Sequence, residues 1–267
     1  MTTTAVMNLK GGPGKTVLVN GLAHAAAARD EDVLIGDVDP QGNSTSHLTG
    51  HNARNLPSTG TLADVLDRRV GRPLEDVVLP ARTRSGIYVA PSGFGEMQEV
   101  QDTLLGQTGG DLSVRRAFRE ARKNGRVLFD CRPAVDLITR AAMLSSDNVL
   151  IVVAPEFDHI EGMISVFSAI NDLYEFADYE LRVAGVVINL FDANRNDHAE
   201  NATYIREYCA NAAVPVLGQP IPKLADISRL TNAGLGMDQH PKPSARTRWL
   251  ADNFADILDG IDRRAAA

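Results

Sequence analysis

Short apolar runs recur along the chain and alternate with longer segments in which apolar residues repeat at helical spacing. Most of these runs are continuous stretches of β-branched or other apolar residues, which is typical of strands covered on both faces of a sheet. The predicted strands are Thr4–Asn8, Val33–Asp37, Ile87–Ala90, Val127–Asp130, Val149–Ala154 and Val183–Asn189.

The segments between these strands have the length and apolar spacing of helices. Regular alternation of strand and helix predicts an α/β fold with a doubly wound, mostly parallel sheet flanked by helices. A chain of 267 residues suits one domain, residues 1–267, and the loose segment 49–60 lacks the features of a domain boundary. Ligands of such sheets bind beyond the carboxyl ends of the strands. The predicted helices lie near residues 15–29, 61–68, 113–123, 134–145, 159–176, 197–212 and 244–260.

The segment Lys10–Thr16 (KGGPGKT) joins the first predicted strand to the first predicted helix. Strand, glycine-rich turn and helix together form a phosphate cradle, because backbone N–H groups and the positive end of the helix dipole point at the ligand. Lys15 supplies a full charge for the β- and γ-phosphates, and the Thr16 hydroxyl can ligate Mg²⁺. The glycines that allow the tight turn are Gly11, Gly12 and Gly14.

A second motif, Asp37–Thr45 (DVDPQGNST), follows the second predicted strand. Asp37 and Asp39 are two residues apart and would point the same way if the strand continued regularly. Beside a phosphate cradle, one carboxylate can help to hold hydrated Mg²⁺ while the other orients an attacking water. Taken alone, the segment is more typical of an acidic loop that caps a helix.

A third motif is the hydrophobic strand Val127–Phe129, which ends at Asp130. A dry strand of this kind can place one carboxylate near the metal of a phosphate site. We therefore expect Asp130 to join the other two motifs at the carboxyl ends of the strands.

Composition narrows the class of protein. The net charge of −7 argues against a generally basic nucleic-acid binder, although a local basic patch is compatible with it. Cys131 and Cys209 lie far apart without metal-ligand spacing, which favours a reduced, cytoplasmic protein. Residues 1–9 hold no basic n-region, and no apolar run is long enough to span a membrane, so we expect neither a signal peptide nor a transmembrane helix.

The three motifs together resemble the deviant P-loop of the ParA/MinD family of ATPases. The usual P-loop glycine is replaced by Leu9, and Lys10 opens the loop, which is the signature of that family. The segment from Asp37 is similar to the family's D-x-D-P-Q-G-N, and the resemblance extends over about residues 3 to 258. The absence of a helix-turn-helix domain before the P-loop resembles the short, Soj-like partition ATPases.

This resemblance implies a P-loop NTPase fold, the ligands ATP and Mg²⁺, and a homodimer that forms with ATP. Lys10 would reach across to the partner's phosphates, and Asp39 would be needed for hydrolysis beside Lys15. The aspartates would hold Mg²⁺ mostly through water. The implied metal residues are Thr16, Asp37 and Asp130, and the implied adenine contacts are Asn189, Pro222 and Lys223.

The same resemblance implies that the dimer binds DNA without sequence preference and is released when a ParB-like centromere-binding protein stimulates hydrolysis. Such a cycle segregates plasmids or chromosomes and would place the protein on the nucleoid. The candidate DNA contacts are Arg195, Arg206 and Arg229, and each alone is typical of a solvated surface charge.

Three residues depart from the family pattern. Pro13 removes one N–H donor from the loop, and Val17 replaces a threonine that can reach the α-phosphate. Arg132 stands where the family has proline. We expect it to point to solvent, and the alternative is that it contacts phosphate or the partner subunit. These departures predict a slow ATPase.

Other family functions remain open. A membrane-bound ATPase would need a basic amphipathic C-terminal helix, whereas the last predicted helix carries an acidic face, which favours packing against the domain. An iron–sulfur relative would need paired cysteines that this chain lacks. An ATPase that positions a protein cargo without binding DNA is the main alternative. The acidic residues of the last helix are Asp252, Asp256, Asp259 and Asp262.

Overall fold

A seven-stranded sheet forms the centre of the computed structural model, which describes residues 2–52, 54–57 and 59–266. Four residues lie outside the described part of the chain. They are residues 53 and 58 of the loose segment 49–60, and residues 1 and 267 at the ends of the predicted domain. The strand order is β3-β4-β2-β5-β1-β6-β7, and only β3 is antiparallel to its neighbour. The doubly wound, mostly parallel sheet is thus confirmed. The strands are β1 (Thr3–Met7), β2 (Val33–Asp37), β3 (Leu79–Pro80), β4 (Ile87–Ala90), β5 (Arg126–Asp130), β6 (Asn148–Val153) and β7 (Arg182–Ile188).

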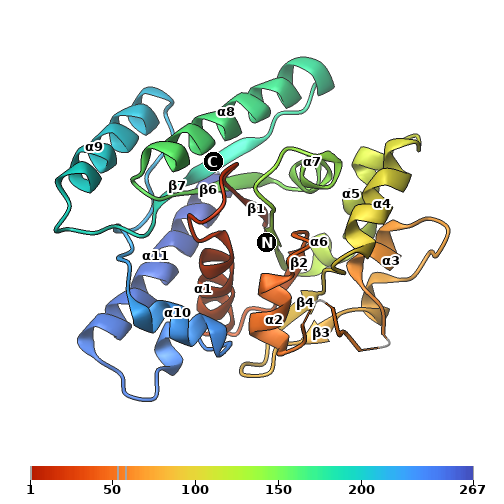
Figure 1. The fold of residues 1–267 in the computed structure, drawn as a ribbon, viewed down its shortest axis with the longest axis horizontal. Helices are drawn as coiled ribbons and strands as arrows, with labels where there is room; N and C mark the ends of the chain where they lie inside the picture. The colour runs from red at the N-terminus through yellow and green to blue at the C-terminus, as the bar shows by residue number, and fades with distance from the viewer. Residues whose placement is uncertain (1, 53, 58, 267) are drawn as a thin grey trace.

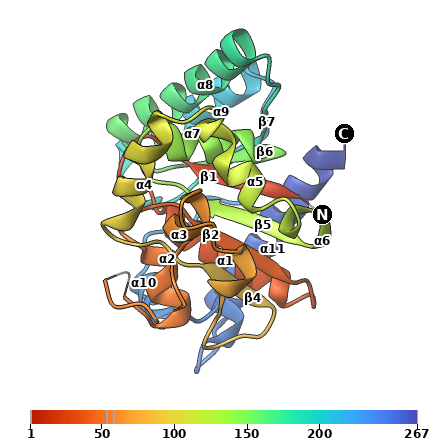
Figure 2. The ribbon, with the colours of Figure 1, turned by 90° about the vertical axis from the view of Figure 1, so that its right-hand side faces the viewer.

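Helices cover both faces of the sheet (Figures 1 and 2). One apolar layer joins the sheet to α1, α2, α10 and α11, and the other joins it to α3, α4, α5, α7, α8 and α9. The α-helices are α1 (Lys15–Ala27), α2 (Asn43–Thr49), α3 (Leu62–Leu66), α4 (Glu96–Leu105), α5 (Ser113–Ala117), α6 (Ala121–Asn124), α7 (Leu137–Leu144), α8 (Phe157–Ala177), α9 (Asn196–Asn211), α10 (Ala225–Asn232) and α11 (Ala245–Ala266). Short 3-10 turns are η1 (Leu74–Asp76), η2 (Gly110–Leu112) and η3 (Met237–Gln239).

Strand alternation divides the core between the two layers. Ala5 and Met7 of β1 face the layer with α7 and α8, whereas Val6 between them faces the layer with α1 and α11. Because the central strands are parallel, their carboxyl ends meet at one edge of the sheet. There Asp37 of β2 lies directly beside Asp130 of β5 in the strand register.

The last helix packs against the domain, as its acidic outer face predicts. Leu250, Phe254 and Ile257 of α11 are buried against α1. Gly21 of α1 makes this approach possible, because a Cβ there would lie 2.4 Å from the Phe254 ring. The apolar stripe of α11 is therefore used within the fold.

Several expectations about elements are wrong in detail. Helices α2, α4 and α10 and strand β3 were not predicted, and the expected helix at 113–123 is divided into α5 and α6. Beyond β7, isolated bridges join Val186 to Val216 and Phe191 to Pro222. The helix expected from residue 134 begins at Leu137, because the Asp136 carboxylate caps it by accepting a hydrogen bond from the Thr139 N–H.

Candidate nucleotide site

The glycine-rich loop folds into a cradle between β1 and α1. Gly12 and Gly14 have φ angles of 95° and 91°, a left-handed conformation that side-chain-bearing residues rarely adopt. The Lys15 ammonium curls back over the loop and donates to the carbonyl oxygens of Lys10 at 3.1 Å and Asn8 at 3.3 Å. Burial lowers the pKa of Lys15, while the carboxylates of Asp130 and Asp39 act in the opposite direction. The predicted cradle residues are thus brought together in one turn.

Polar side chains behind the loop hold it in place, and the sequence did not reveal this function. The Asn8 amide donates to the carbonyl oxygens of Val152 at 2.9 Å and His159 at 3.0 Å, and its Oδ1 accepts the Lys10 N–H at 2.9 Å. The His159 Nε2 lies 2.9 Å from the Gly11 carbonyl oxygen. Gly162 of α8 allows the helix to come this close, because a Cβ there would lie 2.2 Å from Asn8 Oδ1. The polar Asn8 directly after the buried strand β1 is the one sequence signal that could have indicated this support.

Two buried carboxylates lie side by side below the loop. Asp37 Oδ2 accepts hydrogen bonds from the Thr45 N–H and hydroxyl at 2.8 and 2.6 Å, and Asp130 accepts one from the Ser44 hydroxyl at 2.8 Å. Burial, followed by the charge of Asp130, raises the pKa of Asp37 well above its usual range. Burial also raises the pKa of Asp130, against hydrogen bonds from Ser44 and Thr16. Both carboxyl groups therefore favour a nearby positive charge.

This donor set fits Mg²⁺. Asp37 Oδ1 is buried, and within the described residues it has no hydrogen-bond partner. Hydroxyl and carboxylate oxygens are ligands that Mg²⁺ accepts, usually together with water and substrate phosphates. No three His, Cys, Asp or Glu side chains in this part of the chain are grouped closely enough to hold a metal ion by themselves. Mg²⁺ would accordingly need the oxygens of a bound phosphate in addition to Thr16, Asp37 and Asp130.

A cavity of about 620 Å³ opens above the loop, and Asp39 lies in its wall with Lys15 and Thr16. Strand β2 ends at Asp37, so Asp39 belongs to the following turn, where its carboxylate accepts the Gln41 N–H at 3.0 Å. Arg132 lines the same cavity, and the expectation that it points to solvent is wrong. Its side chain is 27% exposed and pairs with Asp136, the capping residue of α7, at 2.7 Å.

Of the predicted adenine contacts, Asn189 touches the loop, while Pro222 and Lys223 contact Phe191. Asn189 is buried, and its amide donates to the Pro13 carbonyl oxygen at 2.7 Å, so it supports the loop from behind. Pro222 bridges to Phe191, and the Lys223 N–H donates to the carbonyl oxygen of the same residue at 3.3 Å. The adenine contacts of these residues stay a prediction.

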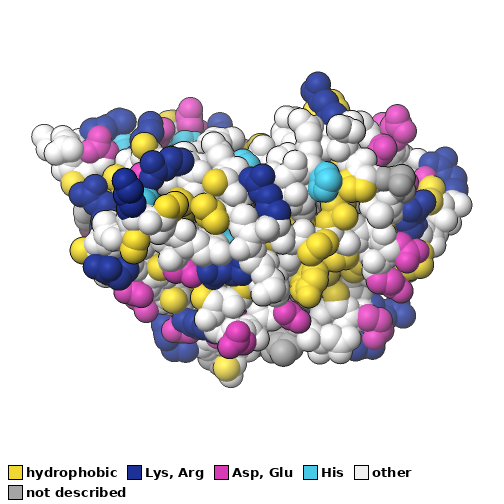
Figure 3. Space-filling model, turned by 90° about the horizontal axis from the view of Figure 1, so that it is seen from below, with side chains coloured by type: hydrophobic (Ala, Val, Ile, Leu, Met, Phe, Trp, Pro, Cys, Tyr) yellow, Lys and Arg dark blue, Asp and Glu magenta, His cyan; other side chains and the backbone are white. Residues whose placement is uncertain are grey.

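Two of the three predicted DNA contacts, Arg195 and Arg229, form ion pairs. Arg195 pairs with Asp197 and with Glu156, and Arg229 pairs with Asp226 at 2.9 Å. Arg206 is exposed on α9. On the face seen from below, Lys and Arg are interspersed with Asp and Glu (Figure 3). All three arginines stay candidate DNA contacts. Binding of DNA by Arg195 or Arg229 is less favourable, because each already pairs with a carboxylate.

A lysine-bearing P-loop beside two buried aspartates at the carboxyl ends of parallel strands defines a P-loop ATPase. A family profile described as "AAA domain" matches residues 1–183. The chromosome partitioning protein ParA of Caulobacter vibrioides is 31% identical over 235 residues, which cover 86% of this chain and 84% of that protein. The chain therefore belongs to the ParA/MinD family of P-loop ATPases, with Soj-like relatives.

A second relative and a solved structure agree with this family and this fold. The chromosome partitioning protein ParA of Myxococcus xanthus is 27% identical over 230 residues, which cover 86% of this chain and 78% of that protein. The solved structure of a Cyanothece McdA variant in complex with ATP has the same fold, with a TM-score of 0.82 and 19% identity over 100% of this chain and 96% of that one. Within the described residues, no helix has the length and apolar character needed to cross a membrane.

Proposed function

We propose that this protein is a partition ATPase of ParA type, which hydrolyses ATP slowly and segregates plasmids or chromosomes. The observation that supports this most directly is that Lys15, Thr16 and Asp39 line one cavity directly above the buried pair Asp37 and Asp130. The similarity to chromosome partitioning proteins adds the biological context. The protein would act in the cytoplasm, associated with the nucleoid.

The residues of the site divide the work of phosphoryl transfer. The loop N–H groups and Lys15 bind the β- and γ-phosphates, and Thr16, Asp37 and Asp130 would hold Mg²⁺, which neutralises charge on the phosphates when bound. Asp39, at the cavity wall, orients the attacking water. Lys10 is exposed at the mouth of the loop, so it is free to reach the phosphates of a second subunit.

That position of Lys10 supports a homodimer that forms only with ATP. We propose that this dimer binds DNA without sequence preference and that a ParB-like partner stimulates hydrolysis and releases it. Lys10 links the two steps, because it stabilises the dimer and the transition state through the same contact.

ATP turnover with and without nonspecific DNA tests this proposal on the wild type, Lys10→Ala and Asp39→Ala. Lys242→Ala is the matched control for Lys10→Ala, because Lys242 is exposed and lies before α11. We expect slow turnover that both site substitutions abolish and the control retains, with ATP-dependent binding of DNA. Unchanged turnover in Asp39→Ala would refute its role in hydrolysis.

A second candidate function is an ATPase that positions a protein cargo without binding DNA. The net charge of −7 and the ion pairs of Arg195 and Arg229 favour it. If ATP dimerises the protein but DNA changes neither binding nor turnover, this candidate replaces DNA partition while the ATPase assignment stands.

A further inference from the structure

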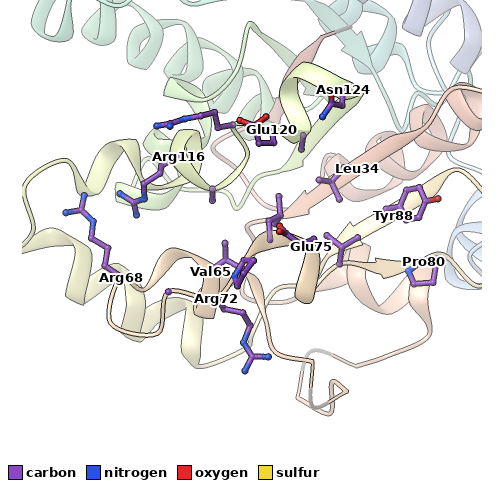
Figure 4. A pocket seen from close by; sticks show the side chains of 17 residues that line it. Leu34, Val65, Arg68, Arg72, Glu75, Pro80, Tyr88, Arg116, Glu120 and Asn124 are labelled. Atoms are coloured by element: carbon purple, nitrogen blue, oxygen red, sulfur yellow. The ribbon is translucent and has the colours of Figure 1, made fainter.

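A cavity of about 990 Å³ lies at the other end of the sheet from the nucleotide loop (Figure 4). Its apolar wall includes Leu34 near the start of β2, Tyr88 near the start of β4, and Val65 of α3. The nucleotide loop, in contrast, adjoins the carboxyl ends of the strands. The two hollows therefore use different ends of the same sheet.

The cavity exists because the helical layer is thin there. Over β1, β6 and β7 the sheet is covered by α7, α8 and α9, whereas β2 and β4 are covered near this cavity by the short elements α3, α6 and η1. As a result Leu34 is only partly buried, and the Tyr88 ring is 38% exposed. An apolar sheet face left open in this way is a common feature of docking sites.

Arginines gather at one end of the cavity. Figure 4 shows Arg68 and Arg116 at the end away from Tyr88 and Pro80. An adjoining cleft of about 670 Å³ shares Arg68, Arg116 and Arg119 with the cavity. The two hollows thus form one site with an apolar part and a basic part, and the larger hollow is also lined by Glu75 and by Glu120, which pairs with Lys123 at 2.9 Å. The other basic residues of the cleft are Arg115, Arg122 and Lys123.

Within the described residues, the shared arginines form no ion pair. Among the residues that the structure describes, Arg68, Arg116 and Arg119 have no carboxylate within 4.0 Å, while nearby Arg122 pairs with Asp147 at 3.0 Å. Burial lowers the pKa of Arg116, and the charges of Arg68 and Arg119 lower it further. In a chain of net charge −7, such a cluster of like charges is well suited to an anionic ligand.

We propose that this site docks a segment of a partner protein that carries acidic and apolar residues together. The apolar side chains would pack on Leu34, Val65 and Tyr88, and the carboxylates would pair with Arg116 and Arg119. The larger hollow alone lies at the upper limit of the roughly 300–1,000 Å³ of small-molecule sites, and the adjoining cleft extends it, which favours a peptide chain. A docked helix would also extend the layer that α3 and α6 leave incomplete. This inference is independent of the proposed partition function.

Duplex DNA or an anionic membrane would use only the basic part of the site. A duplex backbone pairs with arginines but brings no apolar group into the cavity, and a bilayer surface lies across a hollow without filling it. The combination of an apolar wall and unpaired arginines therefore favours an acidic, apolar peptide over either.

A phage-displayed library of random peptides, selected on the full-length wild type, tests the proposal. Synthetic peptides made from the selected sequences are then titrated by fluorescence anisotropy against the wild type and Arg116→Glu/Arg119→Glu. The matched control, Arg182→Glu/Lys242→Glu, makes the same change in charge at exposed positions outside both hollows. Equal ATP affinity of all three proteins verifies that each is folded.

We expect the selected peptides to combine Asp or Glu with apolar residues. They should bind the control like the wild type and bind Arg116→Glu/Arg119→Glu about tenfold or more weakly. Peptides without acidic residues, or equal affinity for both charge variants, would overturn the proposal.

The apolar half has its own test. Tyr88→Ser should weaken the same peptides several-fold while the dependence of binding on salt stays unchanged, because the substitution removes packing and leaves the charges in place. Duplex DNA and vesicles of phosphatidylglycerol and phosphatidylcholine serve as competitors. If either displaces the peptides from the wild type but not from Arg116→Glu/Arg119→Glu, or if Tyr88→Ser has no effect, the peptide assignment is refuted.

Discussion

The two ends of the sheet carry polar groups in opposite ways. At the nucleotide end, Asn8, Lys15 and Asp130 are buried and hydrogen-bonded, and they fix the loop from several sides. At the arginine end, Arg116 and Arg119 are exposed and have no carboxylate partner in the described part of the chain. The first site is assembled before its ligand arrives, whereas the second, in the described part of the chain, presents arginines that a ligand could neutralise.

The free-energy cost of burying a polar group explains this difference between the two ends of the sheet. A buried polar group is costly unless it is hydrogen-bonded, so the nucleotide end tolerates few changes in sequence or geometry. Exposed arginines keep their hydration and repel each other only weakly, so the arginine end tolerates change with little effect on stability. The comparison can be tested by substitutions at or near each end.

The largest effect is expected from Gly14→Ala at the nucleotide end. A Cβ there would lie 2.2 Å from the Asn189 amide nitrogen, and the φ of 91° costs a residue with a side chain about 1–2 kcal/mol. Strain and displacement of Asn189 together should weaken ATP binding about a hundredfold or more, measured with a fluorescent ATP analogue. Gly95→Ala, with open space around its Cβ, is the control and should bind normally. Equal affinity of the two variants would show that the loop is not fixed.

Acid should destabilise the fold through protonation of His24, a buried residue of α1. His24 is 3% exposed in α1, and burial together with the Arg84 guanidinium lowers its pKa to about 4, against the weaker opposing charge of Asp238. The unfolded chain, with a pKa near 6.5, binds this proton more readily, so stability falls as the pH drops from about 6.5 to 4. The loss approaches about 3 kcal/mol, from about 1.4 kcal/mol per pKa unit.

Urea unfolding at pH 7 and pH 5 measures this effect, with His24→Leu as the variant of similar size that lacks the titrating group. The variant should lose less stability than the wild type between these pH values. An identical loss in both proteins would assign the acid sensitivity to other groups.

A moderate effect is expected from Gly162→Ala, which tests the contact of α8 with the loop. Helix propensity alone would make this change stabilising by about 1 kcal/mol. Because the new Cβ would lie 2.2 Å from Asn8 Oδ1 and 2.8 Å from Lys10 Cγ, we expect roughly tenfold weaker ATP binding instead. Ser168→Ala, at an exposed position of the same helix, should leave affinity unchanged. Tighter binding by Gly162→Ala would contradict the proposed support of the loop.

The smallest effect is expected at the arginine end. Arg116→Gln removes one charge from the cluster with Arg68 and Arg119, so it should raise the free energy of unfolding by a few tenths of a kcal/mol at low salt. The gain should disappear at high salt, because screening removes the repulsion. Urea unfolding at both salt concentrations measures it, with Arg182→Gln for comparison. A loss of stability would mean that the cluster has a structural function.

The sequence predicted the features that local motifs determine. Lys15 and Thr16 follow from one strand–turn–helix segment, and Asp37 and Asp130 follow from strand ends that any parallel sheet brings to one edge. The support of the loop by His159 and Gly162 depends on how α8 packs, which no local pattern encodes. Arg132 was misplaced for the same reason, since its partner Asp136 caps a helix whose start was predicted too early.

The arginine end was not predicted, because its members come from separate segments. Leu34 and Tyr88 are register partners on the neighbouring strands β2 and β4, and Arg116 of α5 reaches the same cavity only through the packing of the helical layer. Helix α2 was missed because it is rich in serine and threonine, which are weak helix formers.

The burial of both cysteines has a practical consequence for spectroscopy. Cys131 and Cys209 are at most 1% exposed, and burial raises the pKa of each thiol, that of Cys209 to about 11. Since the thiolate is the reactive form, both native cysteines should resist maleimide dyes in the folded protein. A cysteine introduced at the arginine end and another beside the nucleotide loop would therefore accept a donor and an acceptor fluorophore without removal of the native residues. Energy transfer between them could follow both ends of the sheet in one molecule.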